Sequence, residues 1–324
     1  MSLPDATEPL SAEAADAAFA LLLDGAVGDE AARDFILTMS LRDETAIEIA
    51  AAVRAIRARM IPVKAPDNAI DVCGTGGDMS NSLNVSTAVA IVVAACGVTV
   101  AKHGNRAASS QAGGADTLES LGLDLDRASE TAEATLADLG IAFLFAQKHH
   151  PALVRLAPIR KSIQRRTIFN LTGPACNPAG VKRQLIGIAR PDYLPIYAEA
   201  LSLLGTEDAM LVAGDEPLDE LSIGGPSTVL RLGHPAERIT PDAAGLPTHP
   251  LTAIRGGDAA HNAAALRLLL DGETGAYRDA VLLNAAGALI VAGEVQDWKN
   301  GVEEAAEAID KGLAKALLDC WIAF

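Results

Sequence analysis

The sequence has few cysteines and no recognisable pattern among them. The four, Cys73, Cys96, Cys176 and Cys320, are spread over 324 residues with neither paired nor metal-ligand spacing. A disulfide framework or a zinc site would need such spacing, so neither is expected. We interpret the four as small, buried hydrophobic residues of a protein in the reducing cytoplasm.

No targeting or membrane-spanning segment is visible either. Met1–Leu10 is acidic and broken by proline, whereas a signal peptide begins basic and continues apolar. The uncharged stretch Leu83–Ala101 approaches the length of a transmembrane helix, but Asn84, Ser86 and Thr87 would lie unpaired in lipid. We therefore expect a buried helix and strand there, and a cytoplasmic protein without membrane contacts.

Acidic residues are absent from one long interval of an otherwise acidic chain. The net charge is −16, which disfavours binding to nucleic acid or anionic membranes. Between Asp138 and Asp192, however, the charged residues are all basic: Lys148, Arg155, Arg160, Lys161, Arg165, Arg166, Lys182, Arg183 and Arg190. Either an anionic ligand binds this segment, or the charges are solvated and balanced by acidic residues elsewhere.

Two familiar nucleotide-binding motifs are also missing. A dinucleotide fingerprint needs a third glycine where Met79 stands, and an acidic residue about 20 positions beyond the loop, where Ala88–Ala101 has none. A Walker A loop needs Gly-Lys-Ser/Thr after four spacer residues, and no segment supplies it. Both classes of nucleotide site are excluded.

Two polar, glycine-containing loops are present, each directly after an apolar run. The runs Ile70–Cys73 and Val98–Ala101 are typical of buried parallel strands. Both loops should therefore lie at the carboxyl edge of one sheet, where open α/β sheets bind ligands. In the first loop, Gly74, Gly76 and Gly77 would allow a phosphate to approach backbone amides, with a helix N-terminus following. The pair predicts a phosphate site.

The remaining pattern predicts an α/β fold preceded by a helical module. Residues 10–60 show three amphipathic helical patterns, for which Ser11, Asp29 and Asp43 are candidate N-caps, and Pro62–Pro66 forms a stiff linker. We place a domain boundary there, with a small helical domain at 1–66 and an α/β domain at 67–324. Strands alternating with helices predict a mostly parallel sheet. Further expected strands are Ile141–Ala146, Ala209–Ala213 and Thr228–Leu232, and expected covering helices are Ala259–Leu270, Arg278–Val291 and Gly301–Leu318.

Several long motifs resemble the anthranilate phosphoribosyltransferases of tryptophan biosynthesis. They are GTGGD at 74–78, NVST at 84–87, KHGNRAASSQAGGADTLESLG at 102–122, HHPALVRLAPIRKSIQRRTIFNLTGP at 149–174 and LDELS at 218–222. The likeness spans nearly the whole chain, and KHGNR is its most specific part. The chain departs from the family pattern at Met79, Ser80, Ser82, Gly114 and Ala175-Cys176.

The resemblance implies a fold and a reaction. The fold is a small helical domain on an α/β domain with the site at the hinge, and residues 152–180 would return to the helical domain. The reaction transfers a phosphoribosyl group from phosphoribosyl pyrophosphate (PRPP) to the amine of anthranilate. Because an aryl amine is unprotonated at neutral pH, we assign no general base and expect electrostatic stabilisation and positioning to dominate. The family also implies a homodimer.

The resemblance further implies which residues bind each substrate. Mg²⁺ would be held by Ser86, Asp219 and Glu220, in keeping with the few protein oxygens that this ion usually takes. Anthranilate would contact Gly74, Asn105 and Arg160, the last pairing with its carboxylate. PRPP would be held by Gly74, Gly77, Asp78, Ser82, Asn84, Val85, Ser86, Thr87, Lys102, His103, Gly104, Asn105, Arg106, Ala107, Ala108, Ser109, Ser110 and Gly114.

Two alternatives remain open at this point. A pyrimidine nucleoside phosphorylase would share the helical and α/β plan and would also bind phosphate at glycine loops, although KHGNR and the Asp219-Glu220 pair favour the transferase. A non-catalytic relative could instead use the basic segment to bind nucleic acid, with an affinity that falls steeply with salt. The net charge of −16 disfavours that second alternative.

Overall fold

The computed structural model describes residues 2–107, 111–216 and 218–324. It begins with three helices, α1 (Ala12–Asp24), α2 (Asp29–Leu41) and α3 (Ala46–Arg57). Ser11 caps α1 as predicted, but the expected caps Asp29 and Asp43 are wrong. Thr45 caps α3, because it forms a reciprocal capping box with Glu48. The prediction had chosen the nearby acidic residue instead.

A seven-stranded sheet forms the centre of the molecule, in the order β3-β2-β1-β4-β5-β6-β7. The first five strands in this order run parallel, and β6 and β7 are antiparallel additions at one edge, so the predicted mostly parallel sheet is confirmed. The strands are β1 (Ile70–Gly74), β2 (Val100–Gly104), β3 (Ile141–Phe145), β4 (Arg183–Gly187), β5 (Asp208–Gly214), β6 (Ser227–Arg231) and β7 (Glu237–Ile239).

The strand prediction failed in three places, at the second strand, at β4 and at the short edge strand β7, which was not predicted. The second strand was expected at Val98–Ala101, but Gly97 (φ +94°) ends the preceding turn and the strand starts two residues later, which puts Lys102 inside it. Strand β4 was not predicted, because its apolar run follows an irregular segment without a helical or strand period. It nevertheless pairs with both β1 and β5, at the centre of the sheet.

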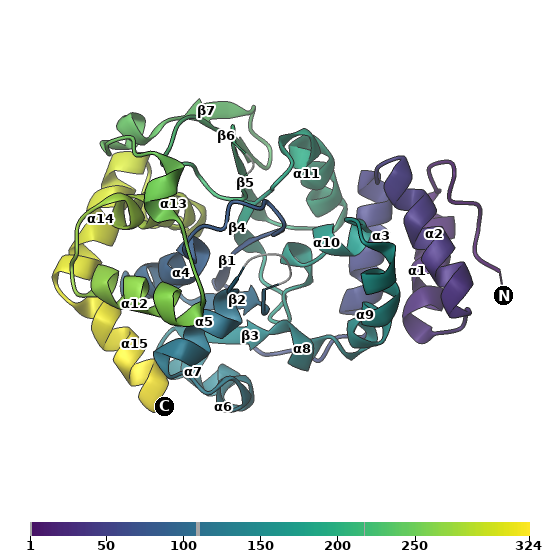
Figure 1. The fold of residues 1–324 in the computed structure, drawn as a ribbon, viewed down its shortest axis with the longest axis horizontal. Helices are drawn as coiled ribbons and strands as arrows, with labels where there is room; N and C mark the ends of the chain where they lie inside the picture. The colour runs from purple at the N-terminus through teal and green to yellow at the C-terminus, as the bar shows by residue number, and fades with distance from the viewer. Residues whose placement is uncertain (1, 108–110, 217) are drawn as a thin grey trace.

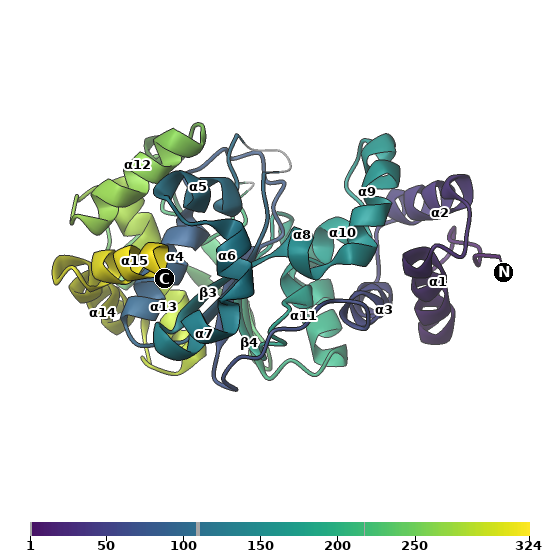
Figure 2. The same cartoon turned by 90° about the horizontal axis from the view of Figure 1, so that it is seen from below.

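Helices cover both faces of the sheet (Figures 1 and 2). Adjacent side chains of β4 point to opposite faces of the sheet, and each meets a different layer of helices. Leu185 packs with the C-terminal helices and Ile186 with the N-terminal ones. The helix expected at Gly301–Leu318 is two helices, because Gly312 (φ +72°) breaks it. The remaining helices are α4 (Val85–Ala95), α5 (Gly114–Leu121), α6 (Leu125–Glu130), α7 (Ala132–Asp138), α8 (Ala146–His149), α9 (Pro151–Ile163), α10 (Ile168–Leu171), α11 (Leu194–Leu203), α12 (Ala259–Leu270), α13 (Ala276–Ala292), α14 (Trp298–Asp310) and α15 (Leu313–Ala323), with short 3₁₀ turns η1 (Pro174–Cys176), η2 (Pro191–Tyr193), η3 (Pro241–Ala244) and η4 (Leu251–Ile254).

We propose that residues 1–66 form a helical domain to which the segment 152–180 returns, on an α/β domain of residues 67–324. In support, α9 packs against α1 and α2, and α10 packs against α2 and α3. Figure 1 shows these five helices together at the end that carries the N-terminus. Helix α11 packs on both α3 and β5 and so joins the two parts. No helix in the described part of the chain combines the length and apolarity needed to cross a membrane.

Candidate active site

A cleft lies where the carboxyl ends of the central strands face the returning segment. Its volume is about 350 Å³, within the range of about 300–1,000 Å³ that is usual for small-molecule sites. Loops after β1, β2 and β5 form one wall, and parts of α9, α10 and η1 form the other. The lining therefore comes from both of the proposed domains.

The loop after β1 is shaped to admit a bulky anion. Gly76 and Gly77 have φ of +70° and +74°, and a Cβ on Gly74 would lie 2.2 Å from the Asp219 carboxylate. The Gly76 amide donates to Asp219 Oδ2 at 2.6 Å, whereas the exposed Gly77 amide has no protein partner among the described residues. Such a backbone turn without side chains is suited to phosphate oxygens.

Three oxygen-bearing residues meet at the base of this loop. The Ser86 amide donates to Glu220 Oε1 at 3.3 Å, and Asp219 is tied to the glycine loop. Burial, then repulsion from Asp78, raises the pKa of Asp219 to about 7, and burial with repulsion from Asp219 raises that of Glu220. Crowded, partly desolvated carboxylates beside a hydroxyl fit a hard divalent cation. Within the described residues no three His, Cys, Asp or Glu side chains form a complete metal cage, so substrate and water oxygens would have to complete the coordination.

Lys102 brings an amino group to the floor of the cleft, where burial lowers its pKa and the Asp71 carboxylate opposes that shift. Its Nζ donates to the Val72 carbonyl at 2.7 Å and to Ser86 Oγ at 3.2 Å, and the residue is 4% exposed. Beneath it lies Asp71, fully buried in β1, which accepts from the His103 amide and from Asn177 Nδ2. Asp71 thus holds β2 and the turn before β4 against β1.

His103 and His150 form a neutral pair at the side of the cleft. His103 Nδ1 lies 3.0 Å from the Gly173 carbonyl, which can only accept, so this nitrogen carries the proton. The other nitrogen, Nε2, then accepts from His150 Nε2 at 3.2 Å. Burial and mutual repulsion lower the pKa of His103 to about 3, and burial with the neighbouring His149 lowers that of His150 to about 4. Both rings are uncharged at neutral pH.

Replacing His150 with glutamine is expected to weaken the pH dependence of stability. Since the folded pKa is depressed, the unfolded chain binds more protons between about pH 4 and 6.5, and stability falls as the pH drops through that window. Urea unfolding at pH 7 and pH 5 should show that the wild type loses about 1–2 kcal/mol more than His150→Gln. An equal loss in both proteins would contradict the neutral-pair assignment.

Two of the predicted substrate residues are engaged with other protein groups. The Arg106 guanidinium pairs with Asp116 at 2.9 Å and with Glu119, and these partners raise its pKa. The Asn84 side chain donates to Ala112 and accepts from Thr117 and Asn262. Both side chains therefore hold the loops around the cleft in place, although both residues still line the cleft.

Arg160 is the unpaired cation of the opposite wall. Its guanidinium carbon lies 5.7 Å from the centre of the Phe169 ring, and it forms no hydrogen bond or ion pair with any described residue. Burial alone lowers its pKa, which shows how little compensates its charge. A guanidinium beside an aromatic face suits a planar ligand that carries a carboxylate.

Most of the residues predicted from sequence line this one cleft. They are Gly74, Gly77, Asn84, Ser86, Thr87, Lys102, His103, Gly104, Asn105, Arg106, Ala107, Gly114, Arg160, Asp219 and Glu220. Asp78 and Ser82 instead line an adjoining pocket, and Val85 is packed in the core. Ala108, Ser109 and Ser110 lie outside the described residues.

Sequence reasoning missed three residues that shape the site. Asp71 was readable as the one acidic residue in an apolar run, a pattern that signals a buried partner. Gly187 lies on β4, a strand that was not predicted. His150 carries no signal of its own in the sequence, because adjacent histidines point to different helix faces, and only the fold places it against His103.

Comparison with known proteins gives consistent results. The family model described as "Glycosyl transferase family, a/b domain" matches residues 66–315. A curated relative from Novosphingobium aromaticivorans, an anthranilate phosphoribosyltransferase, is 67% identical over 99% of this chain and 98% of its own length.

Two solved structures have the same fold. The anthranilate phosphoribosyltransferase of Thermus thermophilus superposes with a TM-score of 0.92 at 41% identity, covering 98% of this chain and 96% of that one. The Saccharomyces cerevisiae enzyme, in complex with PRPP and Mg, gives a TM-score of 0.89 at 28% identity, covering 97% and 93%.

Proposed function

Because the chain belongs to the anthranilate phosphoribosyltransferase family, we propose that PRPP binds between the loops after β1 and β2 and that anthranilate approaches from the α9 side. The enzyme transfers the phosphoribosyl group of PRPP to the amine of anthranilate and releases pyrophosphate, a step of tryptophan biosynthesis. The observation that supports the placement is the convergence of the glycine loop, Lys102, the Asp219-Glu220 pair and Arg160 in one cleft. Loss of anthranilate fluorescence on adding PRPP and Mg²⁺ tests the activity.

The donor side uses positioning and charge. Backbone amides of the glycine loop would hold phosphate oxygens, and Lys102 offers a fixed, buried positive charge near the leaving group. Ser86, Asp219 and Glu220 would hold Mg²⁺, which would neutralise charge on the departing pyrophosphate. A relative that binds PRPP and Mg supports this choice of ion.

The acceptor side needs orientation more than activation. An aryl amine has a free lone pair at neutral pH, so a base is unnecessary, and the neutral His103–His150 pair forms a fixed side of the cleft. Arg160 would bind the anthranilate carboxylate with Phe169 beside the ring, and Asn105 and Gly74 would complete the acceptor contacts. The amine is then directed at the ribose carbon.

Arg160→Ala is expected to weaken the apparent affinity for anthranilate about ten- to 150-fold, because a hydrogen bond to a charged group contributes roughly 1.5–3 kcal/mol. PRPP affinity should change little. Arg160→Lys should recover only part of the loss, since an ammonium keeps the charge without the bidentate geometry. Separate titrations of the two substrates measure this.

Arg155→Ala is the matched control, because Arg155 lies on the same helix but donates to the Leu22 carbonyl of α1. If Arg155→Ala lost as much anthranilate affinity as Arg160→Ala, the proposed role of Arg160 in binding the anthranilate carboxylate would be refuted. Equal losses for anthranilate and PRPP in Arg160→Ala would refute it as well.

We also propose that the enzyme is a cytoplasmic homodimer. Exposed apolar side chains include Leu41 at the end of α2, Ile61 in the linker after α3 and Val154 on α9, at 64%, 52% and 55% exposure, and we propose that two copies bury them between each other. All four cysteines are free, in keeping with a reducing compartment. The expectation that all four are buried is wrong, since Cys73 and Cys96 are half-buried and Cys320 is exposed. Sedimentation of the purified protein decides the oligomeric state.

A further inference from the structure

Arg166 carries a buried guanidinium nitrogen without a hydrogen-bond partner. In the part of the chain that the structure describes, its Nη2 is one of four such side-chain atoms, and the other three belong to His149, His150 and Glu216. Arg166 forms no ion pair with any described residue. A partly buried, uncompensated cation is costly, which points to a partner from outside the chain.

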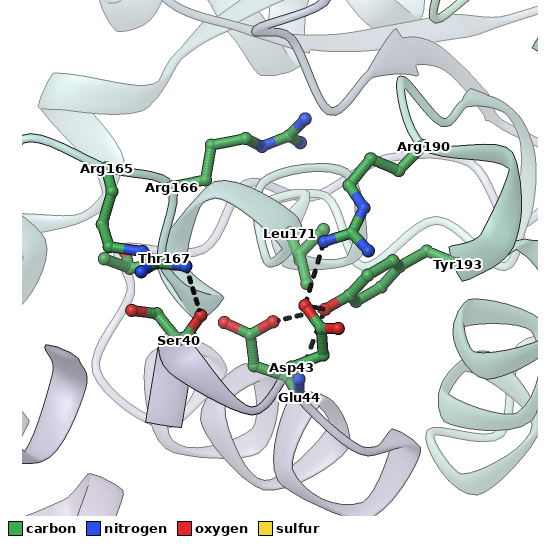
Figure 3. A pocket seen from close by; sticks show the side chains of 9 residues that line it. All are labelled: Ser40, Asp43, Glu44, Arg165, Arg166, Thr167, Leu171, Arg190 and Tyr193. Atoms are coloured by element: carbon green, nitrogen blue, oxygen red, sulfur yellow. Dashed lines mark hydrogen bonds and ion pairs between the residues drawn. The ribbon is translucent and has the colours of Figure 1, made fainter. Parts of the chain in front are cut away.

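The adjacent arginine has a partner, and it points elsewhere. Arg165 Nη2 donates to the Ser40 carbonyl at the end of α2 with a distance of 2.7 Å. Figure 3 shows Arg165 directed to Ser40, whereas the Arg166 side chain extends away from the carboxylates of Asp43 and Glu44 that line the same pocket. The two neighbouring arginines thus serve different parts of the molecule.

Arg166 reaches the phosphate loop. Its Cζ and Nε lie 3.9 Å from the point where a Cβ on Gly77 would stand, so the guanidinium packs over this glycine. Gly77 has φ of +74° and an exposed amide without a protein partner among the described residues. A free backbone amide and an unpaired guanidinium side by side supply the two kinds of donor that phosphate oxygens prefer.

We propose that Arg166 is a further PRPP-binding residue, whose guanidinium binds a phosphate oxygen of PRPP at Gly77. This inference rests on the proposed function, which places PRPP on the same loop. The preceding amide of the loop, at Gly76, donates to the Asp219 carboxylate, which is one of the proposed Mg²⁺ ligands. The pyrophosphate end of PRPP, which would carry the metal, is therefore the favoured contact. The other source of the same chemistry is the 5-phosphate.

Calorimetry on the full-length protein with Mg²⁺ tests the contact, using PRPP, pyrophosphate and ribose 5-phosphate as separate probes. Arg166→Ala should bind PRPP about ten- to 100-fold more weakly, and Arg166→Lys should recover part of the loss. Arg165→Ala, one position earlier and bonded to a backbone carbonyl, should stay within about twofold of the wild type. If Arg166→Ala also weakens the binding of pyrophosphate, Arg166 contacts the pyrophosphate end of PRPP. If it weakens the binding of ribose 5-phosphate instead, Arg166 contacts the 5-phosphate.

Arg166→Gln serves in place of the alanine variant if circular dichroism shows that the latter is not folded. Unchanged affinity for all three probes in a folded Arg166 variant would overturn the inference, as would an equal loss at Arg165. Failure of the wild type to bind PRPP would contradict the proposed function instead. Pyrophosphate alone would still report on Arg166 in that case.

Discussion

Replacing Gly187 with alanine is expected to lower turnover at least about 100-fold, because even a 1 Å misplacement of a reacting or metal-binding group can cost that much. A Cβ at this position would lie 1.5 Å from the carbonyl oxygen of Asp219 and 2.3 Å from its carbonyl carbon. Backbone atoms cannot rotate away, so the loop that carries Asp219 and Glu220 must move. Gly187 is paired with Gly74 across β1 and β4, and the two glycines together make room for Asp219.

Gly225→Ala is the matched control, since Gly225 lies in the connection between β5 and β6 that also carries Asp219 and Glu220. Its φ is ordinary, and a Cβ added there would meet no atom within 4 Å. Steady-state rates at saturating Mg²⁺ and thermal melts separate a displaced site from a lost fold. A folded Gly187→Ala enzyme with normal turnover would show that the position of the acidic loop does not matter.

Asp219→Asn and Glu220→Gln should each reduce kcat/KM about 10²–10³-fold, the usual scale for a preorganised charge that acts on the transition state. Added Mg²⁺ should restore part of the activity, because each variant retains one carboxylate and the Ser86 hydroxyl. The physical reason is that burial, together with repulsion between the carboxylates, already raises the pKa of both groups, and a bound cation would offset both effects.

Asp215→Asn provides the comparison on the same loop, because Asp215 is exposed and paired with Arg238. Its Mg²⁺ titration should coincide with that of the wild type. If the Asp219 and Glu220 variants also kept an unchanged Mg²⁺ dependence, the pair would be an ordinary acidic loop and another group would have to hold the ion.

The sequence predicted the elements with strong local signals. Ile70 to Gly74 and Ile141 to Phe145 are apolar runs that stand between polar loops, and their strands were placed within a residue. The break at Gly312 and the cap at Thr45 were missed, because periodicity extends across a glycine and an acidic residue near a helix start resembles a cap. Such errors leave the site unaffected.

The candidate site was predictable where motifs carry it and unpredictable where distant segments meet. The GTGGD and KHGNR loops identified one wall of the cleft from the sequence alone. The contact of His150 with His103, the room that Gly187 leaves for Asp219 and the approach of Arg166 to Gly77 depend on residues more than 30 positions apart. Only the strand order and the return of α9 to the helical end create these contacts.

The most direct measurement follows anthranilate fluorescence after PRPP and Mg²⁺ are added to the purified protein. The account predicts that the fluorescence disappears, that one pyrophosphate is released for each anthranilate consumed, and that omission of Mg²⁺ slows the reaction. Unchanged fluorescence together with phosphorolysis of uridine or thymidine would contradict the transferase assignment and favour a nucleoside phosphorylase.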